Sequence, residues 1–146
     1  MGDQIEQSDD CIFCKITRGE IPSIKVAEND AAFAFMDINP IAPGHTLVIP
    51  KHHAENIYVT PDHASAAAMA MVSRVAAAVE RAVQPEGINI LQANGPGAKQ
   101  SVFHTHFHII PRSATDGLTM NWELQSGDMA EIEKVAEKIR AELAGG

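Results

Sequence analysis

Three histidines at every second position constrain this chain more than any other feature of its sequence. His104, His106 and His108 lie in the segment HTHFHII. Successive side chains of a β-strand point to opposite faces, so in a strand the three imidazoles share one face, with neighbouring rings about 6.5–7 Å apart. A helix would scatter the rings, and the aliphatic and aromatic neighbours also favour a strand. We therefore predict a strand with a histidine face that Pro111 and Arg112 end, because proline donates no ladder hydrogen bond.

A histidine face concentrates groups that titrate near neutral pH. Two kinds of chemistry suit it. The imidazoles can ligate a metal ion, or they can act as acid, base or nucleophile on an anionic substrate. A polar strand face that happens to be rich in histidine is the structural alternative.

The two cysteines of the chain, Cys11 and Cys14, have the spacing C-x-x-C. In a reducing compartment this spacing is more often a metal half-site or a redox pair than a structural disulfide. A thioredoxin-like redox pair would follow a strand, whereas only a short polar segment precedes Cys11. We favour zinc over a redox pair or two ordinary cysteines. A zinc site needs two further ligands, and histidine is the surplus ligand type in this chain.

The composition limits the class of protein and of partner. With 146 residues, 45% of them apolar, the chain is expected to form one domain with its own core. The net charge of −8 argues against extended binding to a nucleic-acid polymer but not against one small nucleotide. We find neither a signal peptide nor an apolar run long enough for a membrane span, and expect a cytoplasmic protein.

The order of the expected elements predicts an α+β fold. Residues 1–10 are polar and acidic and are expected to form a disordered tail, with a single domain over 11–146. We expect a short helix or turn at the cysteines, and strands near 24–28, 31–38, 45–51 and 88–94 before the histidine strand. Asn29 and Asp30 would close a hairpin between the first two strands. The fold class is thus a mostly antiparallel five-stranded sheet with one long helix and a C-terminal helix.

The long helix is expected from Pro61 to about Val83, with Thr60 as its N-cap. Its apolar stripe is predicted to contain Met69, Val72, Val75, Ala76 and Val79. The C-terminal helix is expected within residues 126–146, where charged pairs at i,i+4 precede two glycines.

The segment NGPGAKQS, directly before the histidines, is a candidate phosphate loop. Gly95 and Gly97 allow backbone N–H groups to converge on an anion, and the side chains of Asn94, Gln100 and Ser101 add donors. A plain hairpin loop is the alternative. A neutral imidazole beside such a loop attacks phosphorus without prior deprotonation, while a second imidazole protonates the leaving group. This combination favours phosphorus chemistry over a catalytic metal.

Together these motifs resemble the histidine-triad (HIT) family, whose motif is His-φ-His-φ-His-φ-φ with apolar φ. Here Thr105 occupies the first φ position, a mild departure. The segments FMDINPIAPGHTLVIPKHH and QSVFHTHFHIIPR resemble the second and third conserved blocks of the family. The resemblance extends from about Cys11 to Trp122 and is strongest to the nucleotide-binding, bacterial-type branch.

The resemblance implies a nucleotidyl hydrolase or transferase that cleaves purine nucleoside phosphoramidates or related nucleotide conjugates. His106 would attack the α-phosphorus to give a nucleotidyl-histidine, which water then hydrolyses. His108 would contact the phosphate, His45 would support the triad, and Asp37 would bind the ribose hydroxyls. The other implied nucleotide contacts are Ile12, Phe13, Ile16 and Phe35 at the base, and Asn94, Gln100 and Ser101 around the phosphate.

The resemblance also implies one structural Zn²⁺ per subunit, held by Cys11, Cys14, His53 and His104, and a homodimer that pairs the long helix and a sheet edge. His52 and His63 are expected at the surface, without an assigned role. Lys99 stands where many members have glycine, and its side chain is a candidate contact for a charged leaving group.

Three functions remain to be distinguished on this basis. The first is the hydrolase or transferase acting through His106. The second is a purine-nucleotide-binding regulatory module with incidental hydrolysis. The third is a metal-dependent enzyme in which the three histidines ligate a catalytic ion.

Overall fold

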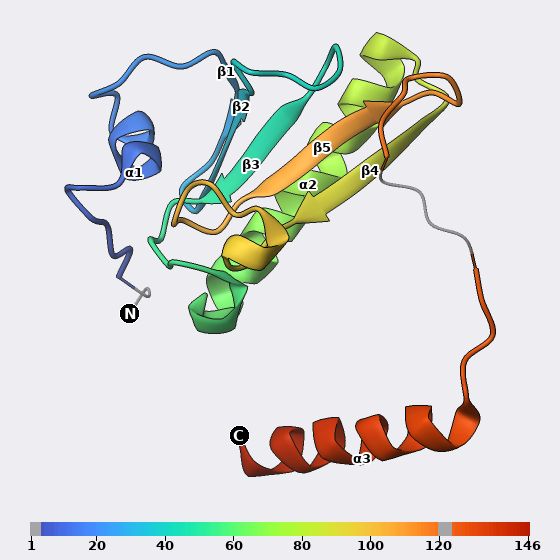
Figure 1. Ribbon diagram of the computed structural model, residues 1–146. Helices are drawn as coiled ribbons and strands as arrows, with labels where there is room; N and C mark the ends of the chain where they lie inside the picture. Colours follow the sequence, from blue (N-terminus) through green and yellow to red (C-terminus); the bar gives the residue numbers. More distant parts are fainter. Residues whose placement is uncertain (1–3, 120–123) are drawn as a thin grey trace. The chain divides into compact units, whose positions relative to one another are not determined.

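An antiparallel sheet of five strands forms the centre of the first part of the chain (Figure 1). The computed structural model describes residues 4–119 and 124–146, and the chain divides into two compact units between Asp116 and Gly117. The strands are β1 (Lys25–Glu28), β2 (Ala32–Met36), β3 (Thr46–Pro50), β4 (Gly87–Gln92) and β5 (Phe107–Arg112), in the spatial order β1-β2-β3-β5-β4. Two short 3-10 turns, η1 (Ile57–Val59) and η2 (Pro96–Ala98), and the helices α1 (Ile12–Thr17) and α2 (Asp62–Val83) complete this unit.

Each face of the sheet is covered by one helix. Side chains alternate along the strands, so Ala34 and Val48 join the α2 layer, whereas Phe35, Leu47 and Ile49 join the α1 layer. Figure 1 shows α2 lying along the sheet behind β3, β5 and β4. The predicted fold class, an antiparallel five-stranded sheet with one long helix and a C-terminal helix, is confirmed. The functional residues lie on the α1 side, where the sheet carries the histidines.

The predicted histidine strand is wrong in its extent. β5 begins at Phe107, so His104 and His106 precede it and only His108 belongs to a strand. The reason is Thr105, whose N–H donates to the Ala54 carbonyl at 2.8 Å instead of continuing the β3 ladder. The strand ends at Arg112, as predicted, and it includes Pro111. β5 pairs with β4 alone beyond Ile109, which leaves room for a residue without an N–H.

Two details of α2 also differ from the prediction. Thr60 does not cap the helix, because its hydroxyl lies 2.7 Å from the Thr105 hydroxyl and donates to the Asn56 carbonyl at 2.7 Å. Met69 lies outside the buried stripe, with 45% of its surface exposed. The buried α2 residues are Ala64, Ala68, Met71, Val72, Val75 and Val79. They recur at the three- and four-residue spacing of one helix face, and Met71 takes the place predicted for Met69.

The second unit contains α3 (Met129–Gly145). The Asp128 carboxylate accepts the N–H groups of Ala130 and Glu131, which satisfies the first turn. This helix confirms the predicted C-terminal helix. No helix among the described residues is both long and apolar enough to cross a membrane.

The segment before α1 is tied to the body of the first unit. The Glu6 carbonyl accepts the His53 N–H at 2.6 Å, and the Gln7 amide donates to the Thr17 hydroxyl and the Lys51 carbonyl. Residues 1–3 of the expected tail lie outside the described residues. The disordered tail over 1–10 and the single domain over 11–146 stay predictions.

Candidate active site and metal centre

The backbone sets the tautomer of His106, which is 4% exposed. Its Nδ1 lies 2.7 Å from the carbonyl oxygen of His104. A carbonyl only accepts, so Nδ1 must carry the proton. The lone pair of the neutral ring is therefore on Nε2. The edge-on ring of Phe13, 5.2 Å away between centroids, packs against the imidazole.

A second backbone group sets the tautomers of His45 and His108. The Ile41 N–H donates to His45 Nδ1 at 3.2 Å, so His45 carries its proton on Nε2. That Nε2 lies 2.9 Å from His108 Nδ1, which must accept. His108 in turn carries its proton on Nε2. Asp37 Oδ2 lies 3.5 Å from His45 Nε2 and stabilises positive charge on this pair.

Burial keeps these imidazoles neutral at physiological pH. It is the largest influence on His106 and lowers its pKa against the opposing effect of the bond to the His104 carbonyl. The pKa of His108 is lowered to about 4 by burial and by the neighbouring His106 and His45. Burial also lowers the pKa of His45, although Asp37 opposes it. A neutral ring with a lone pair on Nε2, His106, and a neutral ring with an N–H on Nε2, His108, therefore lie side by side, with centroids 5.0 Å apart.

His45, His106 and His108 face a cavity of about 460 Å³ between α1 and the sheet. This volume lies within the range of small-molecule sites. Its lining combines apolar side chains with the imidazoles, the carboxylate of Asp37 and the hydroxyl of Ser101. Of the residues expected at a nucleotide, the cavity brings together Ile12, Phe13, Ile16, Phe35, Asp37, His45, Ser101, His106 and His108.

Sequence reasoning missed several wall residues. These include Ile21, Pro22 and Ser23, and also Ile41 and Val102. Ile21 and Pro22 belong to a loop that has no periodic pattern. A sequence signal existed only for Ile41, which lies in the same proline- and glycine-rich loop as His45.

Asn94 and Gln100 do not line this cavity, because both hold backbone groups nearby. The Asn94 carbonyl oxygen accepts the Ile57 N–H at 2.8 Å. Gln100 accepts the Gly95 N–H and donates to the Glu55 and Val102 carbonyls. The structure therefore gives these two amides a role in shaping the loop.

Lys99 adopts the backbone conformation that glycine favours. Its φ is 65°, in the left-handed region, where it caps the turn η2. The replacement of glycine by lysine therefore leaves the loop with a left-handed residue at this position. The Lys99 side chain is exposed.

Cys11, Cys14, His53 and His104 form a group that can hold a metal ion. Nδ1 of His104 lies 3.4 Å and 3.6 Å from the sulfurs of Cys11 and Cys14, respectively, and 3.2 Å from Nδ1 of His53. Cys14 Sγ is 3.6 Å from His53 Nδ1. Zn–S bonds of about 2.3 Å and Zn–N bonds of about 2.0–2.1 Å would place tetrahedral ligands about 3.5–3.6 Å (S–N) and about 3.3–3.4 Å (N–N) apart. The four ligand atoms fit this arrangement.

The protonation of these residues also suits a cation. His104 lies 2.7 Å through Nε2 from the Pro50 carbonyl and so donates there, which turns the lone pair of Nδ1 toward the sulfurs. Burial raises the pKa of the Cys14 thiol to about 11, so a buried thiolate needs a neighbouring positive charge. Both cysteines are free thiols.

Asp37, His45 and His108 also place three ligand-type atoms within 4.8 Å of one another. The Ile41 N–H works against a metal there, because it holds His45 in the tautomer whose Nε2 is protonated. His104 meanwhile directs Nδ1 at the cysteines. Among the described residues the three triad histidines therefore do not converge on one ion, which disfavours the metal-dependent enzyme.

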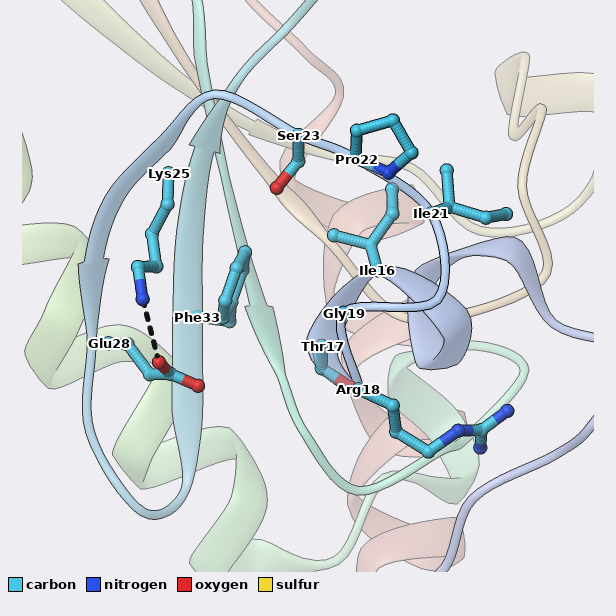
Figure 2. A pocket seen from close by; sticks show the side chains of 10 residues that line it. All are labelled: Ile16, Thr17, Arg18, Gly19, Ile21, Pro22, Ser23, Lys25, Glu28 and Phe33. Carbon is cyan, nitrogen blue, oxygen red and sulfur yellow. Dashed lines mark hydrogen bonds and ion pairs between the residues drawn. The ribbon is translucent and has the colours of Figure 1, made fainter.

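A smaller cavity of about 360 Å³ lies beside the first, and the two share Ile16, Ile21, Pro22 and Ser23 (Figure 2). Its charged groups are already paired. Lys25 binds Glu28 at 3.1 Å and Arg18 binds Glu20 at 2.9 Å. Figure 2 shows the Arg18 guanidinium directed away from Phe33. This cavity therefore does not present free cations to an anion.

His52 and His63 lie outside both sites. Their rings meet edge to face, with centroids 5.8 Å apart, and His52 Nδ1 accepts the Glu6 N–H. Neither residue lines the cavity or belongs to the four-residue metal group.

Known proteins share this architecture. The HIT domain family matches residues 18–115. A crystal structure of a HIT family member from Bacillus subtilis has a TM-score of 0.85 at 40% identity, covering 91% of this chain and 96% of the other. An adenosine 5'-monophosphoramidase of Saccharomyces cerevisiae is 41% identical over 92% of this chain and 84% of its own length. A zinc-bound histidine triad family protein from Mycobacterium smegmatis has a TM-score of 0.71 at 34% identity, covering 93% and 96% of the two chains.

Proposed function

The chain belongs to the HIT family, and on this premise we propose that it is a nucleotidyl hydrolase or transferase. Its substrates would be purine nucleoside phosphoramidates or related nucleotide conjugates. One observation carries the proposal. The His104 carbonyl holds the proton of His106 on Nδ1, and this leaves a neutral Nε2 lone pair in a nucleotide-sized cavity beside a protonated His108 Nε2.

The reaction proceeds in two displacements. The lone pair of His106 Nε2 attacks the α-phosphorus, and the bond from phosphorus to the leaving amine breaks. The amine takes the proton that His108 carries on Nε2, and the N–H that His45 donates to His108 Nδ1 stabilises the negative charge left on the His108 ring until water supplies a proton. The His104 carbonyl stabilises the positive charge on the His106 ring. Water then attacks phosphorus, the bond to His106 breaks, and a proton from the water returns to His108. The products are the amine and the nucleoside monophosphate.

The cavity orients the nucleotide for this attack. The base lies among Ile12, Phe13, Ile16 and Phe35, Asp37 accepts from the ribose hydroxyls, and Ser101 donates to the phosphate. The mostly apolar base end excludes water from the ring but offers little to tell one purine from another. Asn94 and Gln100 maintain the loop that surrounds the phosphate.

Turnover of adenosine phosphoramidate tests the proposal against a regulatory binding module. An enzyme releases AMP at many equivalents per subunit. A binding module retains AMP affinity but releases no more AMP than buffer does. The same assay on the folded, metal-depleted protein excludes a catalytic metal if activity persists.

The pH dependence follows from the buried histidines. His106 acts as a neutral ring, and burial lowers its pKa below the ordinary histidine value. His106 therefore stays largely neutral as the pH falls below about 6.5, the ordinary pKa of histidine. We expect kcat/KM to stay level from pH 8 to below pH 6.5 and to decline only at more acid pH. A decline centred at or above pH 6.5, in protein whose circular dichroism is unchanged, would contradict this assignment.

We also propose that the four-residue metal group binds one Zn²⁺ per subunit in a closed, structural site. The donor set of two thiolates and two imidazoles is one that structural zinc prefers. The ion would tie α1 to the segments around His53 and His104 and so hold one wall of the nucleotide cavity. Two thiolates persist in a reducing compartment, which supports a cytoplasmic location.

A homodimer completes the proposal. β4 lies at the edge of the sheet, and its Ile90 and Leu91 are 43% and 40% exposed. The outer side of α2 is also unusual for a solvent face, because Ala66, Met69 and Ala70 form an exposed stripe of small and apolar residues. A second copy that joins the two sheets edge to edge would cover both surfaces.

Light scattering at micromolar concentration is expected to give the mass of two chains. Ala70→Glu places a charge in the stripe and should give a monomer. Ala78→Glu is the matched control, because Ala78 is also exposed but lies on the side of α2 that faces β1. A monomeric mass for the unmodified protein would refute the dimer.

A further inference from the structure

A further cavity of about 380 Å³ borders the nucleotide cavity. The two share Ile12, Ser101 and Val102, and the further cavity adds Ser8, Asp10 and Phe103, together with two residues of the metal group. Ser101 is the residue that we place at the phosphate. Space next to the phosphate is needed by the group that departs from it, because a nucleophile and a leaving group occupy opposite sides of the phosphorus.

The apolar part of this cavity is open to a ligand. Phe103 is a large hydrophobic side chain, yet 53% of its surface is exposed. Ile12 is 47% exposed at the boundary between the two cavities. An aliphatic or aromatic chain attached to the phosphate would cover both side chains.

The charge of this cavity comes from Asp10. Among residues 4–119 and 124–146, no cation forms an ion pair with the Asp10 carboxylate, whereas its neighbour Asp9 lies 3.6 Å from Arg18. The backbone around Asp10 is held in place. The Ser8 carbonyl accepts the Cys11 N–H at 3.2 Å, and the Ser8 N–H donates to the Cys14 sulfur at 3.4 Å.

We propose that this cavity is the subsite for the leaving group and that it selects amines whose apolar chain ends in a second positive charge. Phe103 and Ile12 would pack on the chain, and Asp10 would pair with the cation, which can also lie over the Phe103 ring. This inference rests on the proposed function and names the class of its substrate. The covalent chemistry is unchanged, since the phosphorus–nitrogen bond breaks and the amine departs with a proton.

Three adenosine phosphoramidates of equal chain length test the subsite. Their amines are butylamine, with a neutral end, putrescine, with an ammonium, and γ-aminobutyrate, with a carboxylate. An exposed ion pair contributes about 0.2–1 kcal/mol, so we expect kcat/KM for the putrescine conjugate to exceed that of the butylamine conjugate about threefold at low salt. The carboxylate conjugate should be the poorest, and salt should reduce the differences.

Two neighbouring aspartates provide the matched variants. Asp10→Asn should bring the ratio of putrescine to butylamine close to one, whereas Asp9→Asn should leave it unchanged. Phe103→Ala should weaken the binding of all three conjugates about two- to fivefold, because each chain loses apolar contact with the ring. AMP has no leaving group, so its dissociation constant should stay the same in all three variants.

The dissociation constants of the three conjugates, measured by competition with AMP on the His106→Ala variant, make the test independent of turnover. Equal affinities there, or a preference for the ammonium that survives Asp10→Asn, would overturn the subsite. If His106→Ala binds the putrescine conjugate preferentially but the unmodified protein turns over none of the conjugates, the proposed hydrolysis is overturned and the subsite is supported.

Discussion

Replacing His106 by alanine should lower the turnover of adenosine phosphoramidate by at least about a thousandfold, because removal of an enzymatic nucleophile costs factors of this size or more. Affinity for AMP should remain within about tenfold of the unmodified protein. In the proposed binding mode the His106 ring would meet the phosphate, while Asp37 and the apolar side chains of the cavity would still hold the nucleoside. Single-turnover kinetics and calorimetric titration with AMP measure the two quantities.

His63→Ala is the control for this variant, because it removes an imidazole outside the cavity. Its turnover should equal that of the unmodified protein. Turnover by His106→Ala at more than about a tenth of the original rate would contradict the covalent role of His106. A loss of AMP binding in parallel with turnover would show that the ring serves binding instead.

Removal of the proposed zinc ion should lower the free energy of unfolding by about 4 kcal/mol, if free zinc exceeds its dissociation constant about a thousandfold in the comparison. For a chain of this size that corresponds to a fall in Tm on the order of 10–20 °C. The metal group joins residues far apart in the sequence, from α1 to the segment before β5, so its loss releases the wall formed by Phe13 and Ile16. AMP affinity should weaken as a secondary effect.

Differential scanning calorimetry with and without a chelator measures this effect, and elemental analysis establishes the zinc content beforehand. Cys14→Ser should reproduce the lowered Tm and show no further response to the chelator. Re-addition of Zn²⁺ should restore the unmodified protein only. Less than about a tenth of an equivalent of zinc, with the same Tm in chelator, would refute the structural metal.

The sheet could be predicted because its local patterns agree with its packing. Residues 32–36 and 46–50 are short aliphatic and aromatic runs bounded by turn residues, and both form strands. The Asn29–Asp30 turn closes the β1–β2 hairpin as expected. The spacing of the histidines, in contrast, led to a wrong extent for their strand. It matches a strand, but a single competing bond from Thr105 to Ala54 decides the local path.

The chemistry of the site could be predicted only in part, because contacts between distant residues determine it. Residue types indicate candidate ligands and candidate nucleophiles, and the choice of His106 among the histidines is what the resemblance to the HIT family implies. The proton positions depend on backbone groups, such as the Ile41 N–H at His45 and the Pro50 carbonyl at His104, which leave no mark in the sequence. Asn94 and Gln100 have the donors expected of a phosphate loop, but the Asn94 amide donates to the Gln92 side chain and the Gln100 amide to the carbonyls of Glu55 and Val102.

The covalent intermediate is the central claim, and mass spectrometry of rapidly quenched protein tests it most directly. Protein mixed with excess adenosine phosphoramidate would be quenched in alkali, where a bond between phosphorus and imidazole survives, and then digested. We predict one adenylyl group on the peptide that contains His106, lost when the substrate is exhausted and absent from His106→Ala. Full turnover with no adenylylated peptide at the earliest times, or an adenylyl group on another residue, would contradict the mechanism.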